Sequence, residues 1–227
     1  MKKHSAHKIC LPLLTVLVLL FNSCIGLSID IQMNRDGSGR LAMEYRISRM
    51  LDSLGALDGN ENMPAIPISR QDWERTIERI GGLRLISYSS NQRGQDTVIA
   101  VTVNYDNPRA LSAILAPGGT RTIISLGSRN GQFNIILNAV DPSRYLDSSQ
   151  YDENLLYLMR TMFTGYSFSL SFSAAETSSL TITNGAGTII SPPSSAQIVP
   201  SGKKVSMSIG MMDLISLPDG LGASINW

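Results

Sequence analysis

Apolar and polar residues alternate with a period of two near the start of this chain, which is typical of half-buried β-strands. Leu27, Ile29, Ile31 and Met33 form the first alternation. A turn over 34–39 separates it from a second alternation over 41–47, so the two segments predict a β-hairpin.

Paired alternations recur further along the chain. The segments 83–89 and 97–105 predict a second hairpin, and 121–126 with 132–137 predict a third around an Asn-Gly turn. After residue 179 the pattern breaks into short strands and turns, with a short helix or turn at 211–217 and an alternating segment over 221–227.

Helical spacing predicts a few helices between these strands. One follows Ser69, an N-cap whose S-x-x-D motif is completed by Asp72, and it ends at Gly81. A second begins at Pro108, with Asp106 or Asn107 as its cap, and turns its apolar residues inward. Two more are expected over 48–57 and 151–163.

This order of elements predicts an α+β fold: antiparallel β-hairpins that form a curved sheet packed by a few helices. Strands do not alternate regularly with helices, so a parallel βαβ architecture is not expected. We expect a single domain over 24–227, which follows a cleaved lipoprotein signal peptide over 1–23.

The signal peptide is predicted from three lysines followed by a thirteen-residue apolar stretch, Ile9 to Phe21. This stretch is shorter than the roughly 20 residues that span a bilayer. It ends in Leu20-Phe21-Asn22-Ser23-Cys24, which resembles the lipobox of bacterial lipoproteins. The resemblance implies that Cys24 receives a diacylglycerol group, that cleavage occurs before it, and that its new amine is acylated.

The alternative is an ordinary signal peptide that leaves Cys24 as a free thiol, which is unusual in an exported protein. We therefore favour lipidation. A lipid anchor with palmitate-type acyl chains predicts a protein of the cell envelope that is attached to a membrane. The sequence does not decide between the inner and the outer membrane. Because a strand begins at Leu27, the domain is expected to lie against the membrane surface.

Composition excludes several classes of enzyme. Both histidines and the other cysteine lie within the signal, so the mature chain lacks catalytic triads, Cys-His pairs and the usual zinc ligands. Removing the signal leaves 16 basic and 18 acidic side chains, which does not favour a nucleic-acid partner. We therefore expect no enzyme activity, no metal and no cofactor.

The remaining polar motifs have plainer explanations. Residues 58–62 begin like a calcium loop but lack its glycine and final carboxylate, so they are interpreted as an acidic loop. The segment 201–204 is interpreted as a hairpin turn with exposed lysines rather than a phosphate loop or a Ser-Lys pair. Glu74 and Glu78 lie beside Arg75 and Arg79, which indicates a charged helix face.

One apolar stripe is the candidate ligand face. Tyr166, Phe168, Leu170 and Phe172 alternate with serines and share one side of a predicted strand. Met159 and Met162, from the preceding helix, either help to seal this side as core or line a groove for an acyl chain. Both possibilities stay open from the pattern alone.

From Gly26 onward, the order of features resembles the LppM-type domain of bacterial lipoproteins. The resemblance rests on the strand after Cys24, the Asp36-Gly37-Ser38-Gly39 turn, and Asn184-Gly185 ahead of the late strands. Pro67-x-Ser69-Arg70 and Gly81-Gly82-Leu83 are similar to motifs of spirochaete lipoproteins. The resemblance implies lipid or glycolipid binding and no catalytic residues.

The resulting hypothesis is a non-enzymatic, membrane-anchored envelope lipoprotein that binds a lipid or acyl chain. The alternative is a structural or interaction lipoprotein that recruits envelope proteins through an exposed sheet edge or patch. A carboxylate-dependent glycan hydrolase is a remote alternative, because it needs two carboxyl groups that face one cleft.

Overall fold

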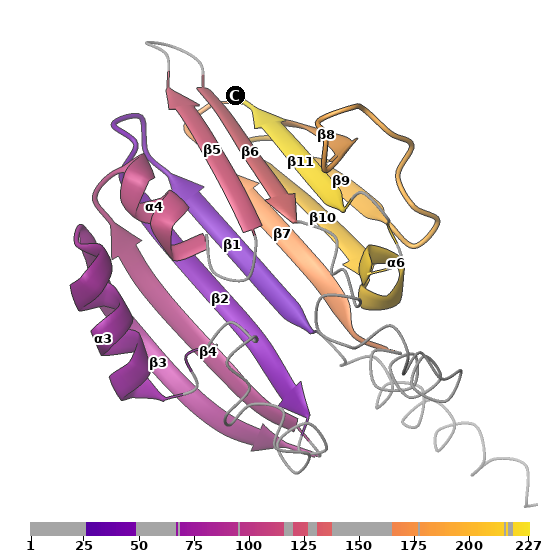
Figure 1. Ribbon diagram of the computed structural model, residues 1–227. Coiled ribbons are helices and arrows are strands. Elements are labelled where there is room, and N and C mark those ends of the chain that lie inside the picture. The colour runs from indigo at the N-terminus through magenta and orange to yellow at the C-terminus, as the bar shows by residue number, and fades with distance from the viewer. Residues whose placement is uncertain are drawn as a thin grey trace, which may run out of the picture.

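The computed structural model describes residues 26–48, 67, 69–94, 96–115, 120–126, 131–137, 165–176, 178–215, 217 and 220–227 (Figure 1). Cys24, the acidic loop at 58–62, and the expected helix at 151–163 lie outside these residues. So does the helix expected at 48–57, except for Ser48, which ends a strand.

The described chain forms two sheets, with the elements expected from the alternating segments. The larger sheet has seven strands in the order β3-β4-β2-β1-β7-β10-β9. These strands are β1 Leu27–Met33, β2 Gly39–Ser48, β3 Leu83–Arg93, β4 Asp96–Tyr105, β7 Ser167–Ser173, β9 Gln197–Ser201 and β10 Lys204–Gly210. The smaller sheet has the order β5-β6-β11-β8. It contains β5 Thr120–Leu126, β6 Gly131–Leu137, β8 Ser179–Asn184 and β11 Leu221–Asn226.

Two features of this arrangement correct the sequence-based expectation of one curved, antiparallel sheet. The strands divide into two sheets, and β7 pairs with β1 in parallel, with Leu27 opposite Phe168 and Ile31 opposite Phe172. The larger sheet is therefore mixed. Hairpin signals specify only neighbours in sequence, and β1 has a second edge that a distant strand fills.

The smaller sheet packs on one face of the larger sheet, and the main core lies between them (Figure 1). Phe133, Ile135 and Ile225 come from the smaller sheet, and each is at most 1% exposed. They meet the alternating apolar residues of β7 and β10, of which Phe172 and Leu170 are fully buried. Alternation therefore places one side of each strand in this core, as expected.

Two helices cover another part of the same face (Figure 1). Helix α3, Arg70–Ile80, has the predicted capping box between Ser69 and Asp72 and ends at Gly81, whose φ is 69°. Its buried Trp73 donates a hydrogen bond from Nε1 to the hydroxyl of Tyr45 at 3.2 Å. The hydroxyl of Tyr45 in turn donates to the carbonyl of Pro67.

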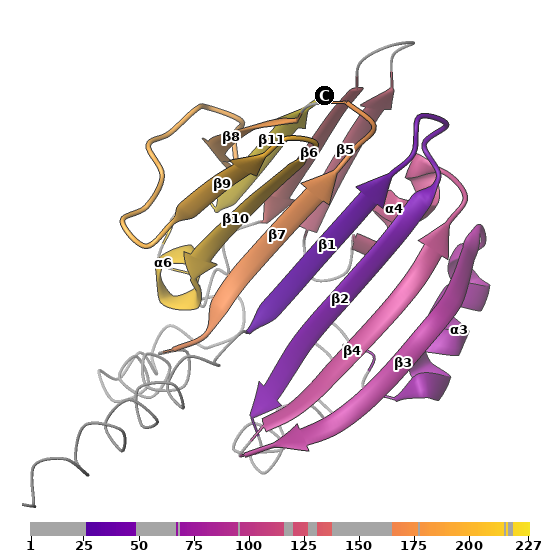
Figure 2. The same cartoon turned by 180° about the vertical axis from the view of Figure 1, so that it is seen from behind.

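Helix α4, Pro108–Leu115, is capped by Asn107, whose side-chain oxygen accepts a hydrogen bond from the backbone N–H of Ala110 at 3.0 Å. Leu111, Ile114 and Leu115 are buried, as predicted. A short third helix, α6, spans Met211–Ile215. In the described part of the chain, no helix or strand covers the opposite face of the larger sheet, which Figure 2 shows from that side.

Candidate functional site

The predicted lipidation site lies just before the described chain. Gly26, two residues after Cys24, is already fixed in the larger sheet. Its N–H donates to the carbonyl of Ser167 at 3.0 Å, and its own carbonyl accepts from the N–H of Arg46 at 3.1 Å. The predicted anchor therefore joins the sheet almost directly, at the end where β1 and β7 begin.

The candidate ligand face on β7 is core where the structure describes it. Phe168, Leu170 and Phe172 are 1%, 0% and 0% exposed. The Phe172 ring stacks on Phe133, with centroids 5.3 Å apart, and meets the Trp227 ring at 4.9 Å. The smaller sheet thus occupies the space that an acyl chain would need over Phe172.

Of the other three members of that predicted set, only Tyr166 is described, and its side chain reaches away from them. Tyr166 precedes β7, is half-buried, and donates a hydrogen bond from its hydroxyl to Asp96 at 3.0 Å. Met159 and Met162 lie outside the described residues. Of six candidate residues, the structure brings together the three that are sealed in the core.

The opposite side of β7 is polar. Its serines face β10 serines across the ladder: Ser169 donates to Ser208 at 3.1 Å, and the hydroxyls of Ser171 and Ser206 share a hydrogen bond of 2.9 Å. Beside them, Lys204 forms an ion pair with Asp30 at 2.7 Å. Along β7, β10 and Asp30 of β1, this side of the larger sheet therefore presents hydroxyls and charges.

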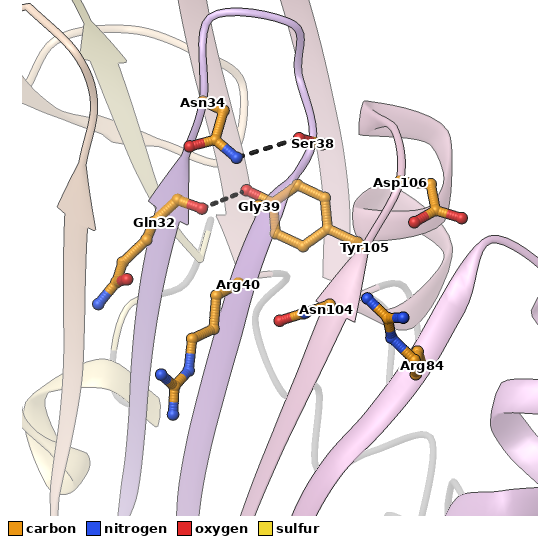
Figure 3. Close-up of a pocket in the computed structure, with 9 residues that line it drawn as sticks. All are labelled: Gln32, Asn34, Ser38, Gly39, Arg40, Arg84, Asn104, Tyr105 and Asp106. Atoms are coloured by element: carbon orange, nitrogen blue, oxygen red, sulfur yellow. Dashed lines mark hydrogen bonds between the residues drawn. The ribbon is translucent and has the colours of Figure 1, made fainter.

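This surface leads into a cleft of about 290 Å³ at the end of the sheet remote from Gly26 (Figure 3). The strand register places four of its polar residues in one row across four neighbouring strands. Gln32 of β1 lies opposite Arg40 of β2, Arg40 lies opposite Asn104 of β4, and Asn104 lies opposite Arg84 of β3. Asn34 and Asp106 line the rim.

At the floor of the cleft, Gly39 lies close to the backbone of Gln32 and to the side chain of Tyr105. Tyr105 is 1% exposed, and its hydroxyl donates to the carbonyl of Gln32 at 2.9 Å. Burial raises the pKa of Tyr105 well above its usual value near 10. Gly39 lies against both groups, and a Cβ there would overlap the Gln32 carbonyl and the Tyr105 hydroxyl. Glycine at this position therefore leaves the space in which the Tyr105 hydroxyl reaches the Gln32 carbonyl.

One wall of the cleft is the β1–β2 turn, which hydrogen bonds hold in shape. Asn34 donates to Ser38 between side chains at 3.0 Å, and the Asn34 N–H donates to the Ser38 carbonyl at 2.8 Å. The side chain and then the backbone of Ser38 donate to Asp36, which lowers the pKa of that carboxyl group even though it is exposed. The wall is therefore formed without a ligand.

The charges in the cleft are unbalanced. Both arginines, Arg40 and Arg84, are exposed, and within the described residues neither forms an ion pair with a carboxylate. Arg35 and Lys204, on either side of this region, are both paired, with Glu176 and Asp30. The cleft thus presents two uncompensated guanidinium groups and a single lining carboxylate, Asp106.

A second groove, of about 380 Å³, lies on the outer side of the smaller sheet. Its lining mixes small polar side chains, such as Thr181 and Ser224, with Ile189, which is 73% exposed. A Cβ at Gly222 would overlap the hydroxyl of Thr183, so glycine keeps this side of β11 bare. The groove carries no charged lining residue.

The sequence did not reveal the cleft. Arg40 and Arg84 each occupy a polar position of an alternating strand, where a solvated charge is the ordinary expectation. Only the register, with β4 between β2 and β3, shows that these two arginines flank the same asparagine. The sequence offers one signal: Arg40 and Arg84 each occupy a polar position near the start of an alternating segment.

No family model matches this chain, and neither the curated proteins nor the solved structures include a match. The resemblance to LppM-type and spirochaete lipoproteins therefore stays a prediction. Among the described residues, no group of histidine, cysteine or acidic side chains is arranged to hold a metal. Within the same residues, no helix has the length and apolar character needed to cross a bilayer.

Proposed function

We propose that this protein is a non-enzymatic lipoprotein of the bacterial cell envelope, anchored by acyl chains on Cys24, whose domain recognises an envelope component through the polar cleft. The observation that carries the proposal is the position of the cleft relative to Gly26. Gln32 lies six positions after Gly26 along extended strand, or about 20 Å away at roughly 3.3 Å per residue. An anchor beside Gly26 would hold the cleft away from the membrane, where soluble envelope components are reached.

The two alternatives have less support. A lipid carrier needs apolar space, but Phe168, Leu170 and Phe172 are packed in the core and the cleft is lined mainly by polar groups. A glycan hydrolase needs two carboxyl groups about 5 to 9.5 Å apart across the substrate. The cleft has one lining carboxylate, Asp106, so it supports binding rather than hydrolysis.

Two measurements in cells test this proposal. The first is membrane fractionation of Cys24→Ser, which is expected to move the protein from the membrane to the soluble fraction. The second places a photo-crosslinking amino acid at Gln32 in the cleft, with the same group at Asn91, an exposed position on edge strand β3, as a control. Crosslinks formed at Gln32 and not at Asn91 support recognition by the cleft. Retention of Cys24→Ser in the membrane, or equal crosslinking at both positions, contradicts the proposal.

A further inference from the structure

The row of side chains across the cleft has a spacing suited to an extended anionic ligand. Arg40 and Arg84 lie two strands apart, so their backbone positions are separated by about 10 Å at roughly 4.8 Å per strand. Asn104 lies between them, as Figure 3 shows. A guanidinium group binds a carboxylate through two parallel hydrogen bonds, and it is less strongly hydrated than an ammonium group. The two arginines therefore favour carboxylates attached to one ligand.

The rest of the lining favours hydroxyl groups. Gln32, Asn34 and Asn104 each have an amide that both donates and accepts hydrogen bonds, and Asp106 accepts them. Sugar hydroxyls also donate and accept, so they match this mixture. The aromatic ring that could have served as an apolar anchor belongs to Tyr105, and it is buried below the floor.

The missing apolar anchor is unfavourable for a peptide ligand. Protein and peptide ligands owe much of their affinity to aromatic or aliphatic side chains that fill desolvated pockets. Ile86, on the exposed edge of β3 near Arg84, is the nearest exposed large apolar residue in sequence, and it does not line the cleft. A volume of about 290 Å³ is at the lower limit for small-molecule sites, which leaves room for about one or two sugar rings inside the open cleft.

The cleft is also formed in advance. Hydrogen bonds within the 34–38 turn hold one wall, and the Tyr105 hydroxyl and Gly39 hold the floor. Binding then orders mainly the two exposed arginine side chains, which limits its entropic cost.

We propose that the cleft binds an acidic saccharide, with Arg40 and Arg84 binding its carboxylates and with Asn104, Gln32 and Asp106 binding its hydroxyl groups. This inference rests on the proposed function, because it names the ligand class for the same cleft. The ligand is held without a chemical step.

The experiment is calorimetric titration of the full-length protein in detergent at low salt. The acidic probes are trigalacturonate and digalacturonate, which carry several carboxylates, and their neutral counterparts are maltotriose and maltose. At least one acidic probe is expected to bind, at least tenfold more tightly than its neutral counterpart. Arg40→Gln and Arg84→Gln are each expected to weaken this binding about tenfold, the loss typical of one charged hydrogen-bonding partner. Both arginines are exposed, so near-ultraviolet circular dichroism is expected to stay unchanged.

Arg93→Gln is the matched control, since Arg93 lies on the same strand and the same face as Arg84, at the far end from the cleft. It is expected to leave the affinity unchanged. An equal loss in Arg93→Gln would show that overall charge, rather than the cleft, attracts the probe, and would overturn the proposal.

Asp106→Ala separates a saccharide site from a site for any polyanion. Removing Asp106 is expected to weaken the saccharide, which loses a hydroxyl acceptor, whereas a ligand held by charge alone would bind more tightly. Hexaglutamate serves as the peptide probe. Tighter binding of hexaglutamate than of both acidic sugars, or no binding of either sugar, overturns the saccharide assignment. Crosslinking in cells at Gln32 would still stand in that case, so failure of the ligand class is distinguishable from failure of the proposed function.

Discussion

Truncating Phe172 tests whether the apolar face of β7 is sealed core or part of a ligand groove. The Phe172 side chain is 0% exposed, and its ring contacts those of Phe133 and Trp227 at centroid distances of 5.3 and 4.9 Å. Phe172→Ala is therefore expected to lower the free energy of unfolding by about 3 to 5 kcal/mol, as for other buried phenylalanines. Within that loss, the two ring pairs account for about 0.5 to 1.5 kcal/mol each.

The assay is urea unfolding of the purified protein, followed by circular dichroism. Ser171→Ala is the control, because Ser171 is the neighbouring residue on the open side of the same strand, and its single hydroxyl bond to Ser206 predicts a loss of about 1 kcal/mol. Phe172→Leu keeps a measurable folded state if the alanine variant fails to fold, with an expected loss of about 1 to 3 kcal/mol. A loss below about 1 kcal/mol for Phe172→Ala, with an unchanged denaturant slope, would refute the packing described here and reopen an acyl-chain groove.

Three further changes are expected to alter stability in defined ways. Gly39→Ala should cost about 1 to 3 kcal/mol in urea unfolding, because its Cβ overlaps the Tyr105 side chain, whereas Gly210→Ala, with its nearest contact at 3.3 Å, should cost less. Ser69→Ala removes the cap of α3 and should cost about 1 kcal/mol; no loss would contradict the capping box. Burial raises the pKa of Tyr45 to about 12. The protonated Tyr45 hydroxyl therefore stabilises the folded state fully below about pH 10, and this stabilisation is lost as pH rises towards 12. Unfolding midpoints measured from pH 9 to 12 should fall, and Tyr45→Phe should flatten that decline.

Local features of this fold were predictable because their causes lie within a few residues. Ser69, Asp72 and Gly81 set both ends of α3 through backbone hydrogen bonds and a positive φ, and the structure confirms these bounds. The β1–β2 hairpin and the cap of α4 at Asn107 belong to the same class. In each case the partners are close in sequence, so pattern and position suffice.

The division into two sheets was not predictable in this way. Strands β6 and β7 both alternate apolar and polar residues, and nothing local assigns them to different sheets. Their separation depends on which distant edges they fill: β7 pairs with β1, whereas β6 pairs with β11. The stacking of Phe172 on Phe133 follows from that choice, which explains why the β7 stripe alone was compatible with either a core or a groove.

The cleft was hidden for a related reason. A charged residue at a polar strand position is ordinary by itself, and Arg93 shows this at the other end of β3. Arg40 and Arg84 form part of a site only because β4 lies between their strands and places Asn104 between them. Gly39 and Tyr105 form the floor beneath this row. A site of this kind depends on how the strands pair with one another, so no local sequence motif predicts it.

Strand β1 connects the predicted anchor with the cleft. Its first residues follow Gly26, which the backbone of Ser167 and Arg46 holds, and its end contributes Gln32 to the cleft. The strand is bonded on both edges, to β2 and β7, so it cannot bend independently of the sheet. A lipid on Cys24 would therefore limit the height of the cleft above the membrane to about 20 Å, the length of β1 between Gly26 and Gln32. A ligand bound by Arg40 and Arg84 would then be held within about 20 Å of the anchor, which suits a protein that connects the membrane to a neighbouring layer of the envelope better than one that carries lipid away from it.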